Sequence, residues 1–457
     1  MKKATLLLAA LLLATGLAAQ NPTLYFMEGS TYRSQLNPAF APQRGYVNLP
    51  GIGGMEVGIN GNVALDNILY PRNGRLVTLL DSSVPADVAL SGLSAQNRIG
   101  AETRINLFGI GMFTANHKNF WSFDLALRTS EETTLPRSLF EFLKRGEEGH
   151  ISDIGLMAES YLEAGFNYSM PLLDDRLYIG FRGKLLVGLA RMQMDYDRFD
   201  VTLQNDRWAV ATHGTIDITA DGTKANPDTE SGLFGLGDLE TSPKGPSGYG
   251  LAVDLGATYD ILPQLQASLA VTDLGFISWS DRKSVTGVSS RETEFTGVDV
   301  PDNGTPAPDF DLELLRFTPV ESSAPTRMLR ASVNAALEYK LWKRRIGIGL
   351  LYTLRFLNYS TVHNITASVN IQPTRWLTFT GSYSALDNRS GAVGLGLSIH
   401  PRWLHFFIAT DLLTSRHTPQ WIPIRQSTAY VTAGIGIPIG RDSHRKTAEF
   451  APRSRKK

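Results

Sequence analysis

The sequence contains no cysteine. This absence excludes disulfides and thiolate metal sites, and it also excludes the lipid-modified N-terminal cysteine of a lipoprotein. Beyond the first 19 residues there is no run of eighteen or more apolar residues, so no transmembrane helix is expected. Neither sign of charge is in excess, with 44 Lys and Arg against 44 Asp and Glu. This balance gives no indication that the protein binds nucleic acid.

The chain begins MKKATLLLAALLLATGLAAQ, with two lysines, a short apolar run and small residues up to Ala19. These features are typical of a secretory signal peptide, with cleavage expected before Gln20. An uncleaved membrane anchor is the alternative. It is disfavoured because the apolar run is short for a spanning helix and ends in small residues. We therefore expect residues 1–19 to direct the chain out of the cytoplasm and to be removed.

The commonest pattern in the rest of the sequence is an alternation of apolar with small or polar residues. In GYGLAVDLGATYD, residues 248–260, every second side chain from Tyr249 to Tyr259 is apolar or aromatic. After a break at ILPQ the alternation resumes, and the last clear example lies at 427–438. A period of two indicates extended strands, since successive side chains point to opposite faces. Two-faced strands of this kind favour an antiparallel sheet.

The connections between these segments alternate between short and long. The short turns are ANHKN (115–119), PLLDD (171–175), QNDR (204–207), ILPQ (261–264), KLWKR (340–344), QPTR (372–375) and HPR (400–402). The other connections include the long loops 66–100, 131–155, 220–247 and 277–327, and two tighter bends near 190 and 357–361. Transmembrane β-barrels sort their connections in this way, with short periplasmic turns and longer outer loops.

The sequence therefore predicts an all-β protein, a transmembrane antiparallel β-barrel over residues 54–440 in the outer membrane of a Gram-negative cell, with lipid against its apolar face. A soluble periplasmic β-sandwich is the alternative, because its buried faces would show the same alternation. Sixteen segments are candidate strands, of which the first, near 54–65, is weak and the sixth, 191–203, is irregular. Bacterial barrels have even strand numbers, so fourteen or sixteen strands are expected.

Five charged residues lie on the polar faces of these strands: Arg182, Lys184, Asp254, Glu338 and Lys340. Such side chains are costly against lipid and ordinary in a wet, hydrogen-bonded barrel interior. We therefore predict that they face the lumen, where they would line a polar channel or form the docking surface of a plug. Their simpler role would be to pair with one another across the barrel and support it.

Residues 20–53 show little alternation and are rich in Pro, Gly and Asn. Their Asn37-Pro38-Ala39 sequence, ahead of a Gly-rich strand, resembles the NPA segment of the FadL-like family. That family comprises outer-membrane transporters of long-chain fatty acids and other hydrophobic compounds, and its N-terminal segment folds into the barrel as a hatch. The resemblance implies that Asn37, Pro38 and Ala39 belong to a lumen hatch. A loose arm outside the barrel is the alternative, because Asn-Pro is also an ordinary turn.

Longer stretches are similar to an uncharacterised family of Gram-negative outer-membrane barrels, a domain of unknown function that is distantly FadL-like. They are LNPAFAP, GYGLAVDLGATYDILPQLQASLAVTDLGFISWS and FFIATDLL (406–413). Two features depart from the FadL-like pattern. The candidate strands number nearer sixteen than fourteen, and the chain continues into the basic tail RDSHRKTAEFAPRSRKK, residues 441–457. We expect that tail to be a disordered periplasmic extension, with binding to an acidic partner or a lipid surface as the alternative.

The sequence offers little sign of catalysis. No GxSxG, HExxH, P-loop or CxxC motif is present. His363, His400 and His405 lie at strand ends, but the expected topology puts His363 on the long-loop side and the other two beside a short turn. The acidic stretches DGTKANPDTESG and DVPDNGTPAPDFD lack the spacing of an EF-hand calcium loop, and we expect solvated loops there. We therefore expect no catalytic site, no metal and no cofactor.

These observations favour passive transport of a hydrophobic or amphipathic small molecule through a lumen that residues 20–53 gate. The alternative is a non-transporting outer-membrane accessory protein whose long loops dock secreted or surface proteins. An outer-membrane hydrolase is a third and weaker hypothesis, because it would need a Ser, His and orienting group brought together on adjacent strands.

Overall fold

The computed structural model describes residues 21–72, 75–145, 149–204, 207–296, 316–386, 390–411 and 427–446. The predicted signal peptide, the acidic stretch at 299–311 and the last eleven residues of the basic tail lie outside these ranges. Among the described residues, no helix is long and apolar enough to span a bilayer.

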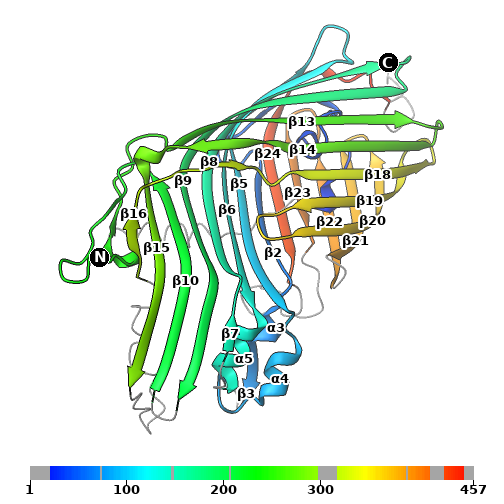
Figure 1. Ribbon diagram of the computed structural model, residues 1–457. Coiled ribbons are helices and arrows are strands. Elements are labelled where there is room, and N and C mark those ends of the chain that lie inside the picture. The colour runs from blue at the N-terminus through cyan, green and yellow to red at the C-terminus, as the bar shows by residue number, and fades with distance from the viewer. Residues whose placement is uncertain are drawn as a thin grey trace, which may run out of the picture.

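A closed antiparallel barrel of fourteen strand positions forms the body of the molecule (Figure 1). Its first position is shared by two short strands, β1 and β2, which both pair with β5 on one side and with β24 on the other. Closure of this kind leaves no unpaired sheet edge in the wall, as a lipid environment requires. In order, the wall consists of β1 (Arg44–Asn48) with β2 (Met55–Gly61), β5 (Gln96–Phe113), β6 (Phe120–Pro136), β8 (Ile154–Leu172), β9 (Leu177–Gln204), β13 (Gly248–Asp260), β14 (Leu265–Trp279), β18 (Ser332–Leu341), β19 (Ile346–Phe356), β20 (Thr361–Thr374), β21 (Leu377–Leu386), β22 (Ser390–Ile399), β23 (His405–Thr410) and β24 (Ala429–Asp442).

The alternation in these strands places apolar side chains outside and polar ones inside. In β13, Leu251 and Leu255 are 54% and 50% exposed, whereas Asp254 is fully buried. Leu350 in β19 and Leu395 in β22 are likewise more than half exposed. A soluble sandwich would bury these leucines and expose the aspartate, so this polarity excludes that alternative. The prediction of an all-β barrel with an apolar exterior is confirmed, at the lower of its two strand numbers.

An extension of the sheet projects beyond the barrel wall (Figure 1). The first half of β9 pairs with β13, but its second half pairs with β10 (Arg207–Ala220), which in turn pairs with β15 (Ser284–Thr296). The expected strand at 191–203 is therefore the continuation of its predecessor, and the bend predicted near 190 is wrong. The pairing register with β8 shifts between Ser160 and Tyr161, so that Leu189 is skipped. Such a β-bulge breaks the alternation without ending the strand.

This extension also corrects the placement of one turn. Because β9 runs on without a reversal, Gln204 and Arg207, the two described residues of the predicted QNDR turn (204–207), pair with each other at the outer end of the extension and not at the short-turn end of the barrel. The remaining elements occupy the long connections, apart from η3 at the start of β15. They are α3 (Leu65–Ile68), β3 (Leu69–Arg72), β4 (Arg75–Thr78), α4 (Ala86–Ser91), α5 (Arg137–Arg145), β7 (Gly149–Ile151), β11 (Lys224–Ala225), η2 (Leu236–Asp238), β12 (Leu239–Glu240), η3 (Asp281–Lys283), β16 (Thr318–Val320) and β17 (Thr326–Met328).

Residues 21–40 lie inside the barrel, and we call them the plug. They contain two short helical turns, η1 (Pro22–Leu24) and α2 (Arg33–Leu36), and no strand. The plug buries apolar side chains such as Leu24, Phe26 and Met27, each at most 2% exposed, in one cluster with the inner wall. The wall begins earlier than the boundary expected at residue 53, because β1 already pairs with both of its neighbours.

Candidate functional site: the plugged lumen

The Asn37-Pro38-Ala39 motif lies against a notch in the inner wall. Gly180 of β9 and Gly256 of β13 are direct cross-strand partners. A methyl group on Gly180 would overlap the backbone of Pro38, and one on Gly256 would overlap the side-chain amide of Asn37. The two glycines are therefore required here for close approach of the plug, because only a residue without Cβ leaves that space.

Hydrogen bonds hold the motif in this notch. The Asn37 side-chain nitrogen lies 3.4 Å from the carbonyl oxygens of both Ala257 in β13 and Leu269 in β14. Its side-chain oxygen accepts a 2.9 Å hydrogen bond from the Ala39 amide, which forms an Asx turn. Ser169 of β8 donates a 2.9 Å hydrogen bond to the Ala39 carbonyl. The motif thus contacts four neighbouring strands, from β8 to β14.

The beginning of the plug is anchored to the opposite part of the wall. The Thr23 hydroxyl donates to Asp411, just after β23, and lies 2.6 Å from the Ser382 hydroxyl in β21. Further along, Glu28 forms an ion pair with Lys340 of β18. Lys340 also contacts Glu338, 3.2 Å away on the same strand. The plug is therefore fixed by side-chain contacts at both of its ends and in its middle.

Eight charged side chains from six consecutive strands form a buried network beside the plug. Four are cations and four are carboxylates: Arg104 (β5), Asp124 and Arg128 (β6), Glu163 (β8), Arg182 and Lys184 (β9), Asp254 (β13) and Asp273 (β14). Arg182 lies 2.6 Å from Asp124, and Lys184 lies 2.7 Å from Asp254 and 2.6 Å from Asp273. The equal numbers of opposite charges make burial in a low-dielectric interior tolerable.

Three of the five lumen-facing candidates, Arg182, Lys184 and Asp254, are members of this network, while Glu338 and Lys340 lie at the plug contact. Asp273 is a member that the sequence analysis missed. The register of β13 with β14 shifts between Val253 and Leu255, and Asp273 has a positive φ of 60°. This bulge turns two successive residues of β14 inward. The sequence carries a signal of this bulge. Leu269 faces outward from an odd-numbered position and Leu274 from an even-numbered one, so the alternation shifts by one residue between them.

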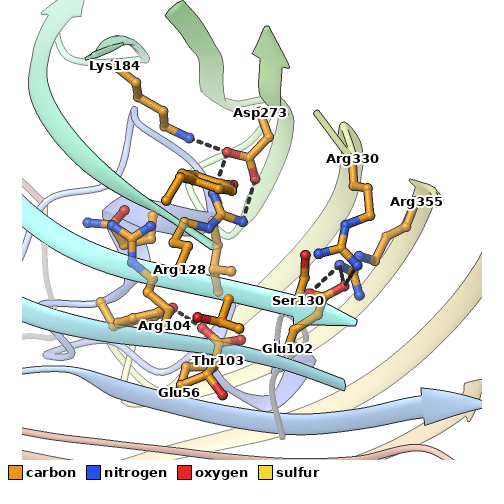
Figure 2. Close-up of a pocket in the computed structure, with 15 residues that line it drawn as sticks. Glu56, Glu102, Thr103, Arg104, Arg128, Ser130, Lys184, Asp273, Arg330 and Arg355 are labelled. Atoms are coloured by element: carbon orange, nitrogen blue, oxygen red, sulfur yellow. Dashed lines mark hydrogen bonds and ion pairs between the residues drawn. The ribbon is translucent and has the colours of Figure 1, made fainter. Parts of the chain in front are cut away.

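A small polar cavity of about 50 Å³ lies between the plug and this network (Figure 2). Tyr32 and Gln35 of the plug form part of its lining. Across it, Glu102 of β5 meets two guanidinium groups, Arg355 of β19 at 2.9 Å and Arg330 at 2.8 Å. A cavity of this size holds a few water molecules and no larger solute. Since β5 and β19 lie on opposite sides of the wall, these ion pairs cross the lumen.

The connection between β19 and β20, residues 357–360, reaches across the lumen further out. The Asn358 amide donates to Glu132 of β6 at 3.0 Å, and the Tyr359 hydroxyl donates to Asp195 of β9 at 2.7 Å. Arg98 of β5 donates to Ser360. The short bend predicted at 357–361 therefore exists, and it reaches the opposite wall. Contacts therefore cross the lumen at three levels: in the plug, in the cross-lumen ion pairs and in this bend.

The two sides of the lumen differ in chemistry. The network lies on β5 to β14, whereas the inward positions of β20, β21 and β22 carry small uncharged residues: Asn364, Thr366, Ser368, Asn370, Gln372, Thr378, Thr380, Ser382, Ser384, Ala392, Gly394, Gly396 and Ser398. Beside them, Ala336, Leu351, Phe407 and Ala409 give an apolar patch that the plug covers. The inner wall is therefore amphipathic once the plug is set aside.

The three histidines singled out in the sequence do not come together. His363 faces outward and lies 2.7 Å from the Tyr352 hydroxyl. His400 and His405 stack at the short-turn end, with ring centroids 6.3 Å apart. In the acidic stretch 221–232, Asp221 pairs with Lys283 at 2.6 Å and Asp228 caps its own turn. No group of three or more potential metal ligands occurs within the part of the chain that the structure describes.

Some solved structures are similar to this chain at low identity. A TodX deltaS2S3 mutant monoaromatic hydrocarbon channel shares 9% identity, with 93% of this chain and 96% of that chain covered and a TM-score of 0.42. The toluene transporter TodX of P. putida shares 9% (91% and 93% covered, TM-score 0.39), and the CymD monoaromatic hydrocarbon channel shares 10% (91% and 94%, TM-score 0.39).

No curated protein matches the chain. A family match, in contrast, covers residues 38–411, from the proline of the NPA motif to the aspartate that binds Thr23. This confirms the resemblance to an uncharacterised barrel family that the sequence stretches indicated. The chain belongs to the Family of unknown function (DUF5723).

Proposed function

We propose that this protein is a gated outer-membrane barrel that lets a small amphipathic molecule cross passively when the plug moves. The observation that carries the proposal is how the plug is attached. It contains no strand and pairs with no wall strand, so its contacts are side-chain hydrogen bonds, one ion pair and an apolar cluster. Such contacts can break without opening the backbone ladder of the wall.

The chemistry of the inner wall supports an amphipathic solute over a pure hydrocarbon. The charged network on β5 to β14 would hydrate or bind a polar group. The apolar patch of Leu351 and Phe407, which the plug covers when the barrel is closed, would accept a hydrophobic part. A purely apolar solute would gain nothing from the charged side, whose desolvation is costly. No reaction is part of the proposal, because transport of this kind needs only a shift between closed and open populations.

The test is conductance in planar bilayers for the mature chain and for a variant that lacks residues 21–40. The deletion has to end before Arg44, since β1 belongs to the wall. A closed full-length barrel and an open deletion variant would support gating, and uptake of amphipathic solutes into vesicles would then define the substrate. Equal conductance in both proteins, with correct insertion shown by protease protection, would contradict the gating role.

A second function, docking of a secreted or surface protein, is favoured by the extension. Among the described residues, the outer edge of β15 is paired with β16 only at Thr286–Val288. An exposed strand edge can add a strand from another chain. Crosslinking from positions along β15 in intact cells, compared with crosslinking from the paired strand β10, would test this. A stable partner captured only from β15 would favour docking.

A further inference from the structure

The basic tail, expected to be a disordered extension, folds back onto the short-turn end of the barrel over residues 443–446. The Ser443 amide donates to the Gln43 carbonyl at 2.8 Å, and the His444 amide donates to the His117 carbonyl at 2.9 Å. The rings of His444 and His117 stack with centroids 4.7 Å apart. Lys446 forms an ion pair with Asp260 at 3.1 Å. We call residues 443–446 the C-terminal strap.

Arg445 is the residue of the strap that enters the barrel. Its Nε donates to the Lys118 carbonyl at 2.7 Å, and one terminal nitrogen donates to both the carbonyl and the hydroxyl of Ser169 at 3.0 Å. The other terminal nitrogen donates to the carbonyl of Ala39 at 3.0 Å. The guanidinium also lies over the Tyr178 ring, 4.6 Å from its centroid. Burial lowers the pKa of Arg445 to about 10, so the group remains a cation at neutral pH.

The contact with Ala39 gives the strap its significance, because Ala39 ends the NPA motif. Its carbonyl accepts hydrogen bonds from both Ser169 and Arg445. One planar guanidinium therefore joins three separate parts of the chain: the plug, the turn before β6 and the end of β8. A lysine could not replace it, since a single ammonium cannot reach these carbonyls in the same fork geometry.

We propose that the C-terminal strap is a lock on the plug, which it holds in its closed position through the hydrogen bond from Arg445 to Ala39. While Arg445 is in place, the end of the plug is held between the glycine notch and the guanidinium. Release of the strap removes one of the two hydrogen bonds to the Ala39 carbonyl and lowers the free-energy cost of moving the plug. The lock goes beyond the proposed transport function, because it concerns the stability of the plug whether or not a solute passes.

Hydrogen exchange of the full mature chain in lipid nanodiscs tests the lock. Arg445→Ala should increase the exchange rate of amides in residues 21–40 by at least about tenfold, which corresponds to a loss of about 1.4 kcal/mol. Arg445→Lys should show nearly the same increase, which separates fork geometry from charge. The matched control is Arg198→Ala, which removes an arginine whose side chain is 52% exposed on the extension, away from the strap and the plug, and should leave exchange in the plug unchanged.

The amides of Ser443 and His444 report independently whether the strap has detached. Loss of their protection in Arg445→Ala with no change in residues 21–40 would overturn the proposal. Conductance measured on the same variants separates this result from the transport function. Faster exchange in the plug without conductance would keep the lock and count against transport, whereas faster exchange with more frequent openings would support both.

Discussion

Gly180 and Gly256 face each other across β9 and β13, and together they make the notch in which Asn37 and Pro38 lie. The relationship explains two otherwise separate features of the sequence, glycine within a strand and an NPA motif outside any strand. A glycine within a strand loses more conformational entropy on folding than other residues do, and it has no side chain that could pack against its neighbours. At these two positions the cost is offset by the close approach of the plug.

Filling this notch should displace the plug. Gly180→Ala places a methyl group on the backbone of Pro38, which cannot rotate away as a side chain would. Overpacking of this kind costs about 1–3 kcal/mol, so exchange of the plug amides should become roughly fivefold to 150-fold faster. Gly381→Ala in β21 is the matched control, because nothing lies within 4 Å of its added methyl group. Equal exchange in the two variants would show that the notch does not hold the plug.

The charged network should behave as a single unit in stability measurements. Asp273→Asn leaves Arg128 and Lys184 without their shared carboxylate and should lower the free energy of unfolding by about 3–5 kcal/mol. Denaturant titration of the barrel in lipid vesicles would measure this change. Asp442→Asn, which breaks the Arg44 ion pair at a carboxylate that is 70% exposed, should cost less than about 1 kcal/mol. Similar costs for the two variants would contradict the assignment of Asp273 to a buried network.

The ion pair between Glu102 and Arg355 should limit the width of the lumen once the plug is gone. Combining Arg355→Ala with deletion of residues 21–40 should give a larger single-channel conductance than the deletion alone, because the guanidinium crosses the lumen. Thr353→Ala is the control, since Thr353 faces inward from the same strand and, within the described parts of the chain, donates a hydrogen bond to its neighbour Asn334 on β18, not across the lumen. If both combinations conduct like the deletion alone, the narrowest point lies elsewhere, and the bend at 357–360 is then the next segment to change.

The sequence predicts the wall well because the wall depends on a local property. Lys184 and Asp254 face inward since they alternate with leucines, and a period of two needs no knowledge of distant partners. The same logic fails at Leu189 and Asp273, where a bulge shifts the alternation by one residue. The alternation of short and long connections likewise assigned QNDR to the wrong end of the barrel, because it counted a bend near 190 that the continuous strand β9 does not make.

The lumen is harder to predict, because its contacts join residues far apart in the chain. Arg445 lies in a short basic tail with no periodicity, and only the folded barrel brings it to Ala39, 406 residues earlier. Glu102 and Arg355 likewise meet only because the barrel closes. The NPA motif predicted that a plug exists through a resemblance, but the glycines that receive it could be assigned only from the cross-strand register.

Acid should loosen the plug near Gly29. This glycine has a φ of 98°, and its carbonyl oxygen is hydrogen-bonded to Nε2 of His405. The His400 ring occupies the space that a Cβ at position 29 would need. Burial, together with the neighbouring His405, lowers the pKa of His400 to about 3. In any state where water reaches this imidazole, the pKa of His400 returns to its ordinary value near 6.5. The ring then binds a proton that it does not bind in the closed state.

The closed state should therefore lose stability as pH falls from about 6.5 towards 3, by at most roughly 1.4 kcal/mol per pH unit. Exchange protection around Gly29, corrected for the intrinsic pH dependence of exchange, should fall up to about tenfold between pH 6.5 and 5.5. His400→Phe keeps the ring and removes the titration, so its protection should change less over this range. His213→Phe, at a half-exposed histidine on the extension, should keep the wild-type profile. A wild-type profile in His400→Phe would assign the acid response to another group.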